Sequence, residues 1–459
     1  MTVVSAKAQT GPATREEKAG WIVLHLQGSP HDIGYQYGYL LAPEIHDADR
    51  ALQLYLKHMT GRDWVFFRNA AKRLFWPKLD PEYREELTGL ADGLKARGYP
   101  YTPADMLAHN GWIELDWYYL PTLQAAKLHR RAISKAPSFC SAFIATGRMT
   151  RDGKIVMAHN TWIDYIIGER MNVILDIRPQ HGNRLMMDTW PGWIFSGSDF
   201  AINSAGLLIT ETTITGFTGF KEDGIPEFDR ARKAAQYAGS LDDFVRIMSE
   251  GNNGGYANTW LVGDTKTNEI GKLELGLKNM HFTRSKDGAF FGCNLPENPR
   301  LIAQECVPGS DKDLAAVCRK ERWTALLAAN RGQIDAAKAR SFLADTYDER
   351  RHKQGASMTT LMAHREEDSR PGIYAPYYPF GTVNAKVVTT DLAQHMQFWA
   401  RMGFPDGSEF HVKPFLARHP AFAWQQPYLR SIQAHPWVLI GASAAANLPE
   451  IEPPARFAR

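Results

Sequence analysis

Cysteine is scarce in this chain of 459 residues, and the four positions are Cys140, Cys293, Cys306 and Cys318. They include no Cys-x-x-Cys pair and no arrangement with histidine at zinc-site spacing, so we expect no metal. They are also too few for a disulfide framework, although Cys293, Cys306 and Cys318 leave room for one bridge. The sequence therefore excludes a small disulfide-rich scaffold and a zinc-finger module.

Long apolar runs and blocks of one charge are also missing. No stretch of about 18 apolar residues occurs, so no membrane-spanning helix is expected. The 53 Lys and Arg residues nearly balance the 50 Asp and Glu residues, and no basic block marks a nucleic-acid partner. The polar N-terminus lacks the apolar core of a signal peptide, although Ser5-Ala6-Lys7-Ala8 is compatible with the remainder of a removed export signal. The compartment stays open between the cytoplasm and the periplasm.

Several familiar hydrolase and nucleotide-binding motifs are absent. The chain has no G-x-S-x-G, no H-E-x-x-H, no P-loop and no G-x-G-x-x-G. A serine triad of that pattern and a zinc protease therefore have no support. What remains is a globular composition, 44% hydrophobic and 22% charged, in a chain long enough to bury a large core.

The first 139 residues predict mainly helix. Apolar residues recur at helical spacing over 32–59. Asp80-Pro81-Glu82 is a typical helix start, with a cap, a proline at the first position and an acid in the first turn, for a helix that closes at Gly98. Thr102-Pro103 begins a further helix by the same pattern.

From Ser138 onward the pattern changes to short β-type runs joined by turns. Hairpins are expected for 140–146 with 155–162, 171–179 with 184–190, 200–203 with 207–213, 260–263 with 270–275, and 281–284 with 289–293. Helices are expected at 229–238, 241–250, 314–330 and 391–402. Strand pairs interrupted by helices indicate an α+β fold of antiparallel sheets covered by helices.

Cys140 is the candidate nucleophile. It stands at the junction of the helical third and the β-rich remainder, at the first residue of a predicted strand. Most single cysteines are inert core residues, so position alone does not assign it a role. Its surroundings do: Phe139-Cys140-Ser141-Ala142-Phe143 is followed by an Asp-Gly turn and then by Ala158-His159-Asn160-Thr161-Trp162.

This arrangement resembles the start of the catalytic chain in N-terminal-nucleophile (Ntn) hydrolases. It is most similar to phospholipase B-like proteins and to the cysteine-peptidase family typified by isopenicillin N acyltransferase. Further blocks agree in order: 28–38 (Gly-Ser-Pro-His-Asp-Ile-Gly-Tyr-Gln-Tyr-Gly), 198–213, 251–260 and 381–387. The resemblance extends from about residue 20 to about residue 430.

The resemblance implies a four-layer αββα sandwich of antiparallel sheets with an N-terminal helical segment, and a chain that cuts itself between Phe139 and Cys140. Residues 1–139 would then form a separate segment, and 140–459 the catalytic chain with a C-terminal extension. After cleavage, Cys140 would have both a thiol and a free α-amine, so one residue would supply the nucleophile and the base. The resemblance implies no cofactor.

Further site residues follow from the same resemblance. Asn258 matches the position whose amide holds the oxyanion, against an equal alternative of an ordinary sheet-edge hydrogen bond. His159 and Thr161 share the task of orienting the Cys140 amine, since Thr161 stands where many acyltransferase relatives have Asp. Trp162, Asn160 and Glu211 are candidates for substrate binding; Trp162 is equally well plain core, and Glu211 equally well faces solvent. Lys386 is expected to be structural, and Asp164 either orients His159 or belongs to a turn.

The expected function is hydrolysis of an amide or ester bond of a small acylated or lipid-like substrate through an acyl-thioester on Cys140. The alternatives are an acyltransferase that passes the acyl group to an amine, and a non-catalytic member of the fold that binds a lipid or acyl ligand. A third is an uncleaved hydrolase with His159 as base to Cys140. A homo-oligomer is left open.

Overall fold

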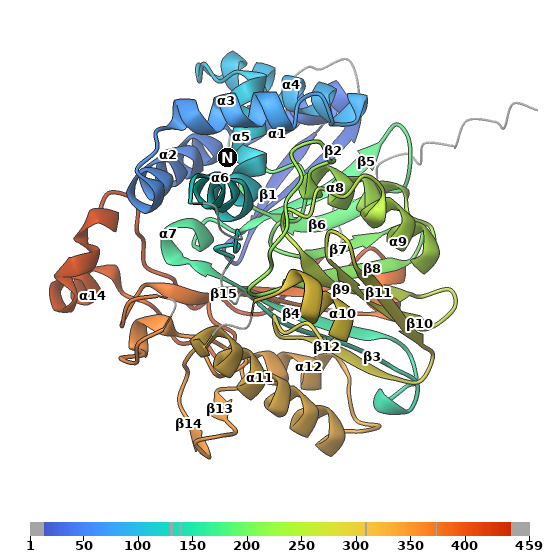
Figure 1. The fold of residues 1–459 in the computed structure, drawn as a ribbon. Coiled ribbons are helices and arrows are strands. Elements are labelled where there is room, and N and C mark those ends of the chain that lie inside the picture. Colours follow the sequence, from blue (N-terminus) through green and yellow to red (C-terminus); the bar gives the residue numbers. More distant parts are fainter. Residues whose placement is uncertain (1–12, 129–131, 137–139, 308–309, 373, 442–459) are drawn as a thin grey trace, which may run out of the picture.

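The structure is a computed structural model that describes residues 13–128, 132–136, 140–307, 310–372 and 374–441. Two β-sheets lie face to face, and helices cover the outer face of each (Figure 1). The helices of the N-terminal third, with α8 and α9, cover one sheet, and α11 and α12 cover the other (Figure 1). This is the expected layered α+β fold, in the order helix, sheet, sheet, helix.

The larger sheet has nine strands in the order β1-β2-β5-β6-β7-β8-β9-β10-β11. Their bounds are β1 Thr14–Lys18, β2 Trp21–Gly28, β5 Val173–Pro179, β6 Leu185–Thr189, β7 Phe200–Asn203, β8 Leu207–Thr213, β9 Asn258–Asp264, β10 Glu269–Leu275 and β11 Met280–Ser285. Neighbouring strands run antiparallel, except that β2 and β5 pair in parallel.

The smaller sheet has six strands in the order β12-β3-β4-β15-β16-β17, and all its pairs are antiparallel. Their bounds are β3 Ser141–Thr146, β4 Val156–Asp164, β12 Gly288–Gly292, β15 Phe380–Thr389, β16 Phe398–Met402 and β17 Val438–Ile440. A short pair, β13 Tyr347–Asp348 and β14 Lys353–Gln354, stands apart.

Two of the helices, α4 and α5, begin at the predicted Asp80-Pro81 and Thr102-Pro103 signals. The longer ones are α1 Pro30–Leu40, α2 Ala42–Thr60, α3 Trp64–Leu74, α4 Pro81–Ala96, α5 Pro103–Glu114, α6 Leu120–Lys127, α8 Glu227–Tyr237, α9 Leu241–Ser249, α11 Ser310–Ala329 and α12 Ala336–Leu343. The shorter ones are α7 Tyr165–Gly168, α10 Pro299–Glu305, α13 Thr390–Gln394 and α14 Val412–Arg418. A π-helical turn, η1 Leu115–Tyr119, joins α5 to α6. Ser29 and Thr102 both form capping boxes, with the acid three residues later bonding back to the cap.

Three apolar cores hold the layers together. Side chains of alternate strand positions from both sheets, such as Val23, Ile144 and Leu261, interlock between the sheets. Phe143, one residue before Ile144, faces the other way and packs under α11 and α12 with Trp323 and Phe342. A larger core joins the nine-stranded sheet to the N-terminal helices. Because successive side chains of β3 point to opposite faces of the sheet, this one strand contributes to two cores.

Glycines let α1 and α4 touch along their backbones. A Cβ added at Gly34 would lie 1.9 Å from the Glu86 carbonyl oxygen, and one at Gly89 would lie 2.1 Å from the His31 carbonyl oxygen. Real Cβ atoms do not approach this closely, so only glycine fits at either position. The Gly-x-x-x-Gly spacing within the block 28–38 therefore has a structural meaning.

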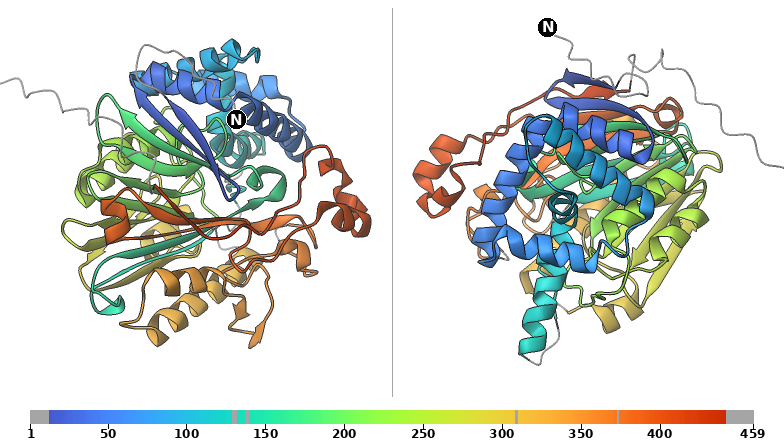
Figure 2. Two further views of the ribbon diagram at one scale, coloured as in Figure 1. Left: turned by 180° about the vertical axis from the view of Figure 1, so that it is seen from behind. Right: turned by 90° about the horizontal axis from the view of Figure 1, so that it is seen from above.

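The N-terminal segment is not purely helical, because β1 and β2 form part of the nine-stranded sheet. β2 pairs along its full length with β5, from Ile22 with Val173 to Gly28 with Pro179. In the view from behind, β1 and β2 run along the sheet edge beneath the N-terminal helices (Figure 2). Residues on both sides of Cys140 therefore build one sheet.

Four expectations are wrong. The helix over 32–59 is two helices, which break at Leu41. Segments 281–284 and 289–293 do not pair: β11 bonds to β10 in one sheet and β12 to β3 in the other, because the turn at Lys286-Asp287 carries the chain between sheets. The helix over 391–402 ends at Gln394, and 398–402 is β16. All four cysteines are free, so there is no bridge.

Candidate active site

Cys140 lies immediately before β3, buried between the layers with 1% of its surface exposed. Its backbone is left-handed, with φ of 67°, a conformation that costs a non-glycine residue roughly 1–3 kcal/mol. Phe139, the other half of the expected cleavage site, lies outside the described residues. The strained backbone is a local feature that the surrounding packing has to hold in place.

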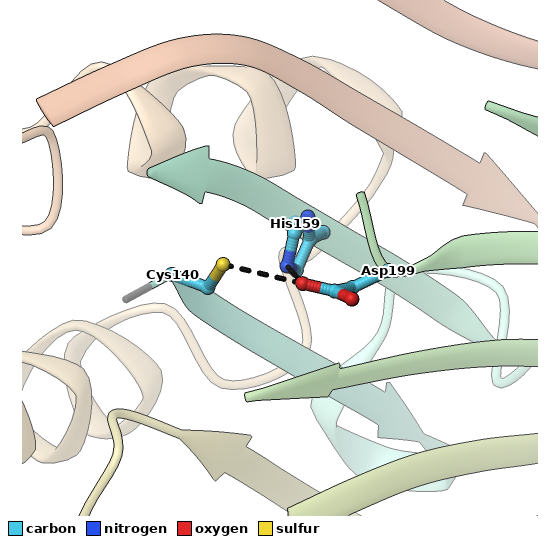
Figure 3. Close-up of side chains that lie close together, drawn as sticks. All are labelled: Cys140, His159 and Asp199. Atoms are coloured by element: carbon cyan, nitrogen blue, oxygen red, sulfur yellow. Dashed lines mark hydrogen bonds and ion pairs between the residues drawn. The ribbon is translucent and has the colours of Figure 1, made fainter. Parts of the chain in front are cut away.

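The Cys140 thiol faces a carboxyl group. Its Sγ lies 3.4 Å from Oδ2 of Asp199. Figure 3 shows the two side chains pointing toward each other. Asp199 directly precedes β7 and also has a left-handed backbone, with φ of 71°. Burial, followed by the charges of Asp199 and Glu211, raises the pKa of the Cys140 thiol well above its ordinary value, so the thiol is protonated at neutral pH.

His159 approaches the same carboxyl group from β4. Its Nε2 lies 3.9 Å from Oδ2 of Asp199 (Figure 3), and its side chain is wholly buried. Burial, aided by the nearby Lys386 ammonium, lowers the pKa of His159 well below its ordinary value. The ring is therefore neutral, and Asp199 stands between it and the thiol.

The side chains of Thr161 and Lys386 lie next to His159 and are bonded to each other. Thr161 Oγ1 lies 3.4 Å from Nδ1 of His159 and donates to the Ser198 carbonyl at 2.9 Å. Lys386 Nζ donates to Thr161 Oγ1 at 2.5 Å and pairs with Asp188 at 2.7 Å, with both partners of the pair wholly buried. Lys386 thus ties β15 to β4 and to the turn that carries Asp199.

Glu211 and Asp199 form a buried carboxyl pair. Burial and the Asp199 charge raise the pKa of Glu211 well above its ordinary value. Burial also raises the pKa of Asp199, but the Glu211 hydrogen bond and the Lys386 charge oppose that rise. Two carboxylates cannot both ionise at this depth, so Glu211 keeps its proton and Asp199, whose pKa is raised to about 7, is the one of the pair that ionises. Glu211 is buried and does not face solvent.

Asn258 begins β9, in register with Thr213 of β8 and Leu275 of β10. Neither its amide nitrogen nor its amide oxygen has a partner among the described residues, although both are buried. Two residues earlier, burial raises the pKa of the Tyr256 phenol well above its ordinary value, and the nearby charges of Asp199, Glu211 and Cys140 raise it further. A buried amide whose nitrogen and oxygen have no partner among the described residues is suited to holding an oxyanion.

The N-terminal segment braces the loop that leads into Asn258. Glu114, at the end of α5, accepts from Asn253 Nδ2 at 2.5 Å and from the Glu227 backbone amide at 2.7 Å. Tyr118, in the π-helical turn, accepts from the Ala257 amide at 3.1 Å. The position of Asn258 therefore depends on residues from the other side of Cys140.

The other two predicted substrate-binding residues differ in position: Asn160 faces away from the cluster, whereas the backbone of Trp162 hydrogen-bonds the Cys140 thiol. Asn160 is turned to the opposite face of β4, where its amide donates to the Leu343 and Leu361 carbonyls. Trp162 is buried below the guanidinium of Arg319, at 4.5 Å. The structure does not bring Asn160 to the cluster. Asp164 lies at the far end of β4, where Tyr55 and Tyr374 bond its carboxylate, away from His159.

Sequence reasoning missed Asp199 and Arg319. Asp199 lies in the block 198–213 that carried the resemblance, and an acid directly before a strand, next to a serine, was the available signal. Nothing in the sequence marked Arg319 as a site residue, because an arginine in a predicted helix is usually exposed to solvent.

The cluster also bears on metal binding. A thiolate, an imidazole and a carboxylate are ligands that zinc accepts, and these three atoms lie within 4.8 Å of one another. In the described part of the chain, that group has three such side chains, the number of protein ligands in catalytic zinc sites, whereas structural zinc sites take four.

The site and layers together define a class: a two-sheet α+β protein with a buried, strained cysteine at the start of a strand between the sheets. Comparison with known proteins identifies the family within this class. The sequence model of the phospholipase B family matches residues 51–305, more than half of the chain, and the chain belongs to this family.

The similarity to individual proteins covers only part of their length. An uncharacterized protein of Archaeoglobus fulgidus is 26% identical over 55% of this chain and 42% of its own. Putative phospholipase B-like 2 of Rattus norvegicus is 32% identical, and phospholipase B-like 1 of Homo sapiens is 31% identical, each over 28% of this chain and 24% of its own. The chain thus spans less than half the length of these relatives. Among the described helices, none is both long and apolar enough to cross a membrane.

Proposed function

We propose that this chain is a self-processing cysteine hydrolase of the Ntn type, with Cys140 as nucleophile. The observation that carries the proposal is the Cys140 thiol held 3.4 Å from a buried carboxylate at a left-handed backbone position. The family assignment supports a hydrolase, and the names of the relatives point to a lipid ester.

In the first reaction the chain acts on itself. Asp199 takes the thiol proton, and Cys140 Sγ attacks the carbonyl carbon of residue 139. The peptide C–N bond breaks, the acyl group moves from nitrogen to sulfur, and the proton goes to the leaving nitrogen. Water then hydrolyses the thioester, which leaves a carboxyl group on residue 139 and a free amine and thiol on Cys140. The backbone strain at Cys140 favours this reaction because cleavage releases it.

In the second reaction the same groups act on a substrate. The free α-amine, whose ordinary pKa is near ~8, takes the thiol proton, and Cys140 forms a thioester with the acyl group. Asn258 holds the oxyanion, and the amine returns the proton to the leaving group. Asp199 and the neutral His159 hold the amine in place. They thereby do what an Asp does in many acyltransferase relatives at the position where this chain has Thr161. Water is the acceptor that we favour over an amine.

The segment 1–139 remains in place after cleavage. The β2–β5 pairing, the packing of α1 on the sheet and the Glu114 and Tyr118 contacts all join it to the catalytic chain. We therefore expect a two-chain protein that purifies as one unit.

Trapping the acyl-enzyme tests this function. The protein is incubated with a long-chain acyl ester or amide, quenched in acid, and mapped by peptide mass for a hydroxylamine-labile acyl group. We expect the group on Cys140, and a Cys293→Ala variant with the same labelling, because Cys293 is a second buried free cysteine. Turnover with no adduct on Cys140, or turnover that survives Cys140→Ala, would contradict the proposal.

A further inference from the structure

Arg319, on α11, is a buried arginine without an acidic partner. Its side chain has no exposed surface. One nitrogen, Nη1, donates to the Cys140 carbonyl at 2.7 Å, and the guanidinium lies 4.5 Å from the centre of the Trp162 ring. Its Nε and Nη2 make no hydrogen bond to any described residue.

Arg232 shows how this protein otherwise buries an arginine. It is also almost fully buried, but it pairs with Glu86 at 3.0 Å and donates to Gln236 at 2.6 Å. The titratable groups that act on Arg319 are three thiols, those of Cys293, Cys140 and Cys318, whose pKa values burial raises, and no carboxylate is among them. Burial lowers the pKa of Arg319 to about 10, which still leaves it charged at pH 7.

An unpaired buried cation is costly, and proteins keep such groups where a ligand completes them. The bond to the Cys140 carbonyl fixes the guanidinium next to the nucleophile, and the Trp162 face fixes its plane. The two N–H groups that have no partner, Nε and Nη2, therefore belong to a guanidinium that is bonded to the nucleophile residue itself. A planar fork of N–H donors matches the two oxygens of a carboxylate or a phosphate.

We propose that Arg319 and Trp162 form an anion-binding subsite, and that the substrate carries a carboxylate or phosphate close to its scissile acyl bond. This rests on the proposed function of Cys140 and names the substrate class of the same site. Such substrates include N-acyl amino acids and acyl esters of glycerol phosphate. The neutral counterparts, acyl amides and acylglycerols, fit the nucleophile but leave the guanidinium unpaired.

Matched substrates test the subsite directly. The kcat/KM of N-lauroylglycine is compared with that of N-lauroylglycinamide, which differs in the charge, and a second pair compares lauroyl glycerol phosphate with lauroyl glycerol. We expect wild-type protein to favour the anionic member of at least one pair by about 10-fold or more, the size of one charge-assisted hydrogen bond. The pair that shows the preference distinguishes a carboxylate from a phosphate ligand.

Variants then assign the preference to Arg319. Arg319→Gln should abolish the preference, by lowering kcat/KM for the anionic substrates far more than for the neutral ones, and Arg319→Lys should keep part of it. Arg340→Gln is the matched control, because Arg340 also lies over a tryptophan, at 4.6 Å from the Trp399 ring, but is not buried at the site. It should leave the preference unchanged.

Two results would overturn the inference: equal rates for charged and neutral substrates in the wild type, or an equal loss for both in Arg319→Gln with no recovery in Arg319→Lys. Intact mass separates these from failure of the proposed function. If Cys140 is not at a free N-terminus and no substrate turns over, the proposed function itself has failed. If cleaved protein turns over both substrates equally, only the anion subsite has failed.

Discussion

Asp199→Asn should slow self-cleavage sharply, and two opposing effects set its size. The substitution keeps the shape of the side chain but removes the acceptor that lies 3.4 Å from the Cys140 thiol. It also removes a negative charge, which favours the thiolate. At that distance and an effective dielectric constant of 20, the charge is worth at most about 5 kcal/mol.

The loss of the acceptor outweighs the gain in thiolate. Burial is the largest cause of the raised pKa of Cys140, and it persists in the variant. The thiol therefore stays protonated at pH 7 and now lacks a base. Since general-base catalysis contributes typically about 10²–10⁴-fold, we expect cleavage to slow by that factor.

Glu211→Gln is the matched control, because Glu211 already holds a proton next to Asp199 and the amide copies its neutral form. The assay follows the cleaved fraction by intact mass after synthesis of the chain in a cell-free system. Cleavage should be slow in Asp199→Asn and within a few-fold of wild type in Glu211→Gln. The reverse order would refute the assignment of base and proton, and equal rates in both variants and the wild type would remove Asp199 from the reaction.

Three further outcomes are expected. Asn258→Ala should lower kcat by about 10²–10³ with little change in KM, as loss of one oxyanion donor does, and a change confined to KM would speak against that role. In a Cys140→Ala background, Glu114 has its pKa raised to about 7 by burial, so the folded chain binds the extra proton and stability falls as pH rises from about 4 to 7. Glu114→Gln should remove up to about 3 kcal/mol of that fall in urea unfolding, and an unchanged pH slope would refute the burial argument. Gly34→Ala should cost at least about 2 kcal/mol through its backbone clash, whereas Gly239→Ala, whose Cβ meets its nearest neighbour at 3.6 Å, should cost little by the same assay.

Local signals in the sequence were sufficient for most of the fold. Asp-Gly and Ser-Ala-Gly turns between β-type runs predicted β3–β4 and β7–β8, and the caps at Thr102 and Asp80 predicted α5 and α4. The failures are tertiary. A turn such as Lys286-Asp287-Gly288 has the same sequence pattern whether it closes a hairpin or connects two sheets. The pairing of β11 with β10 and of β12 with β3 determines which of the two forms.

The site was predicted unevenly for the same reason. Cys140 and His159 were marked by the motif around β3 and β4, and the structure places them on either side of one carboxylate. That carboxylate, Asp199, comes from the turn before β7 in the other sheet, and Arg319 comes from a helix much later in the chain. Residues that meet only through the packing of two sheets leave no pattern in a single sequence.

The most direct test of the account is the N-terminus of the large fragment. Intact mass and N-terminal sequencing of wild-type protein should give two fragments of about 16 and 36 kDa from the 51.7 kDa chain, the larger beginning at Cys140. Cys140→Ala should stay whole and Cys293→Ala should cleave as the wild type does. A wild-type chain that stays uncut yet hydrolyses an acyl substrate would contradict the account, because Cys140 would then work without its free amine.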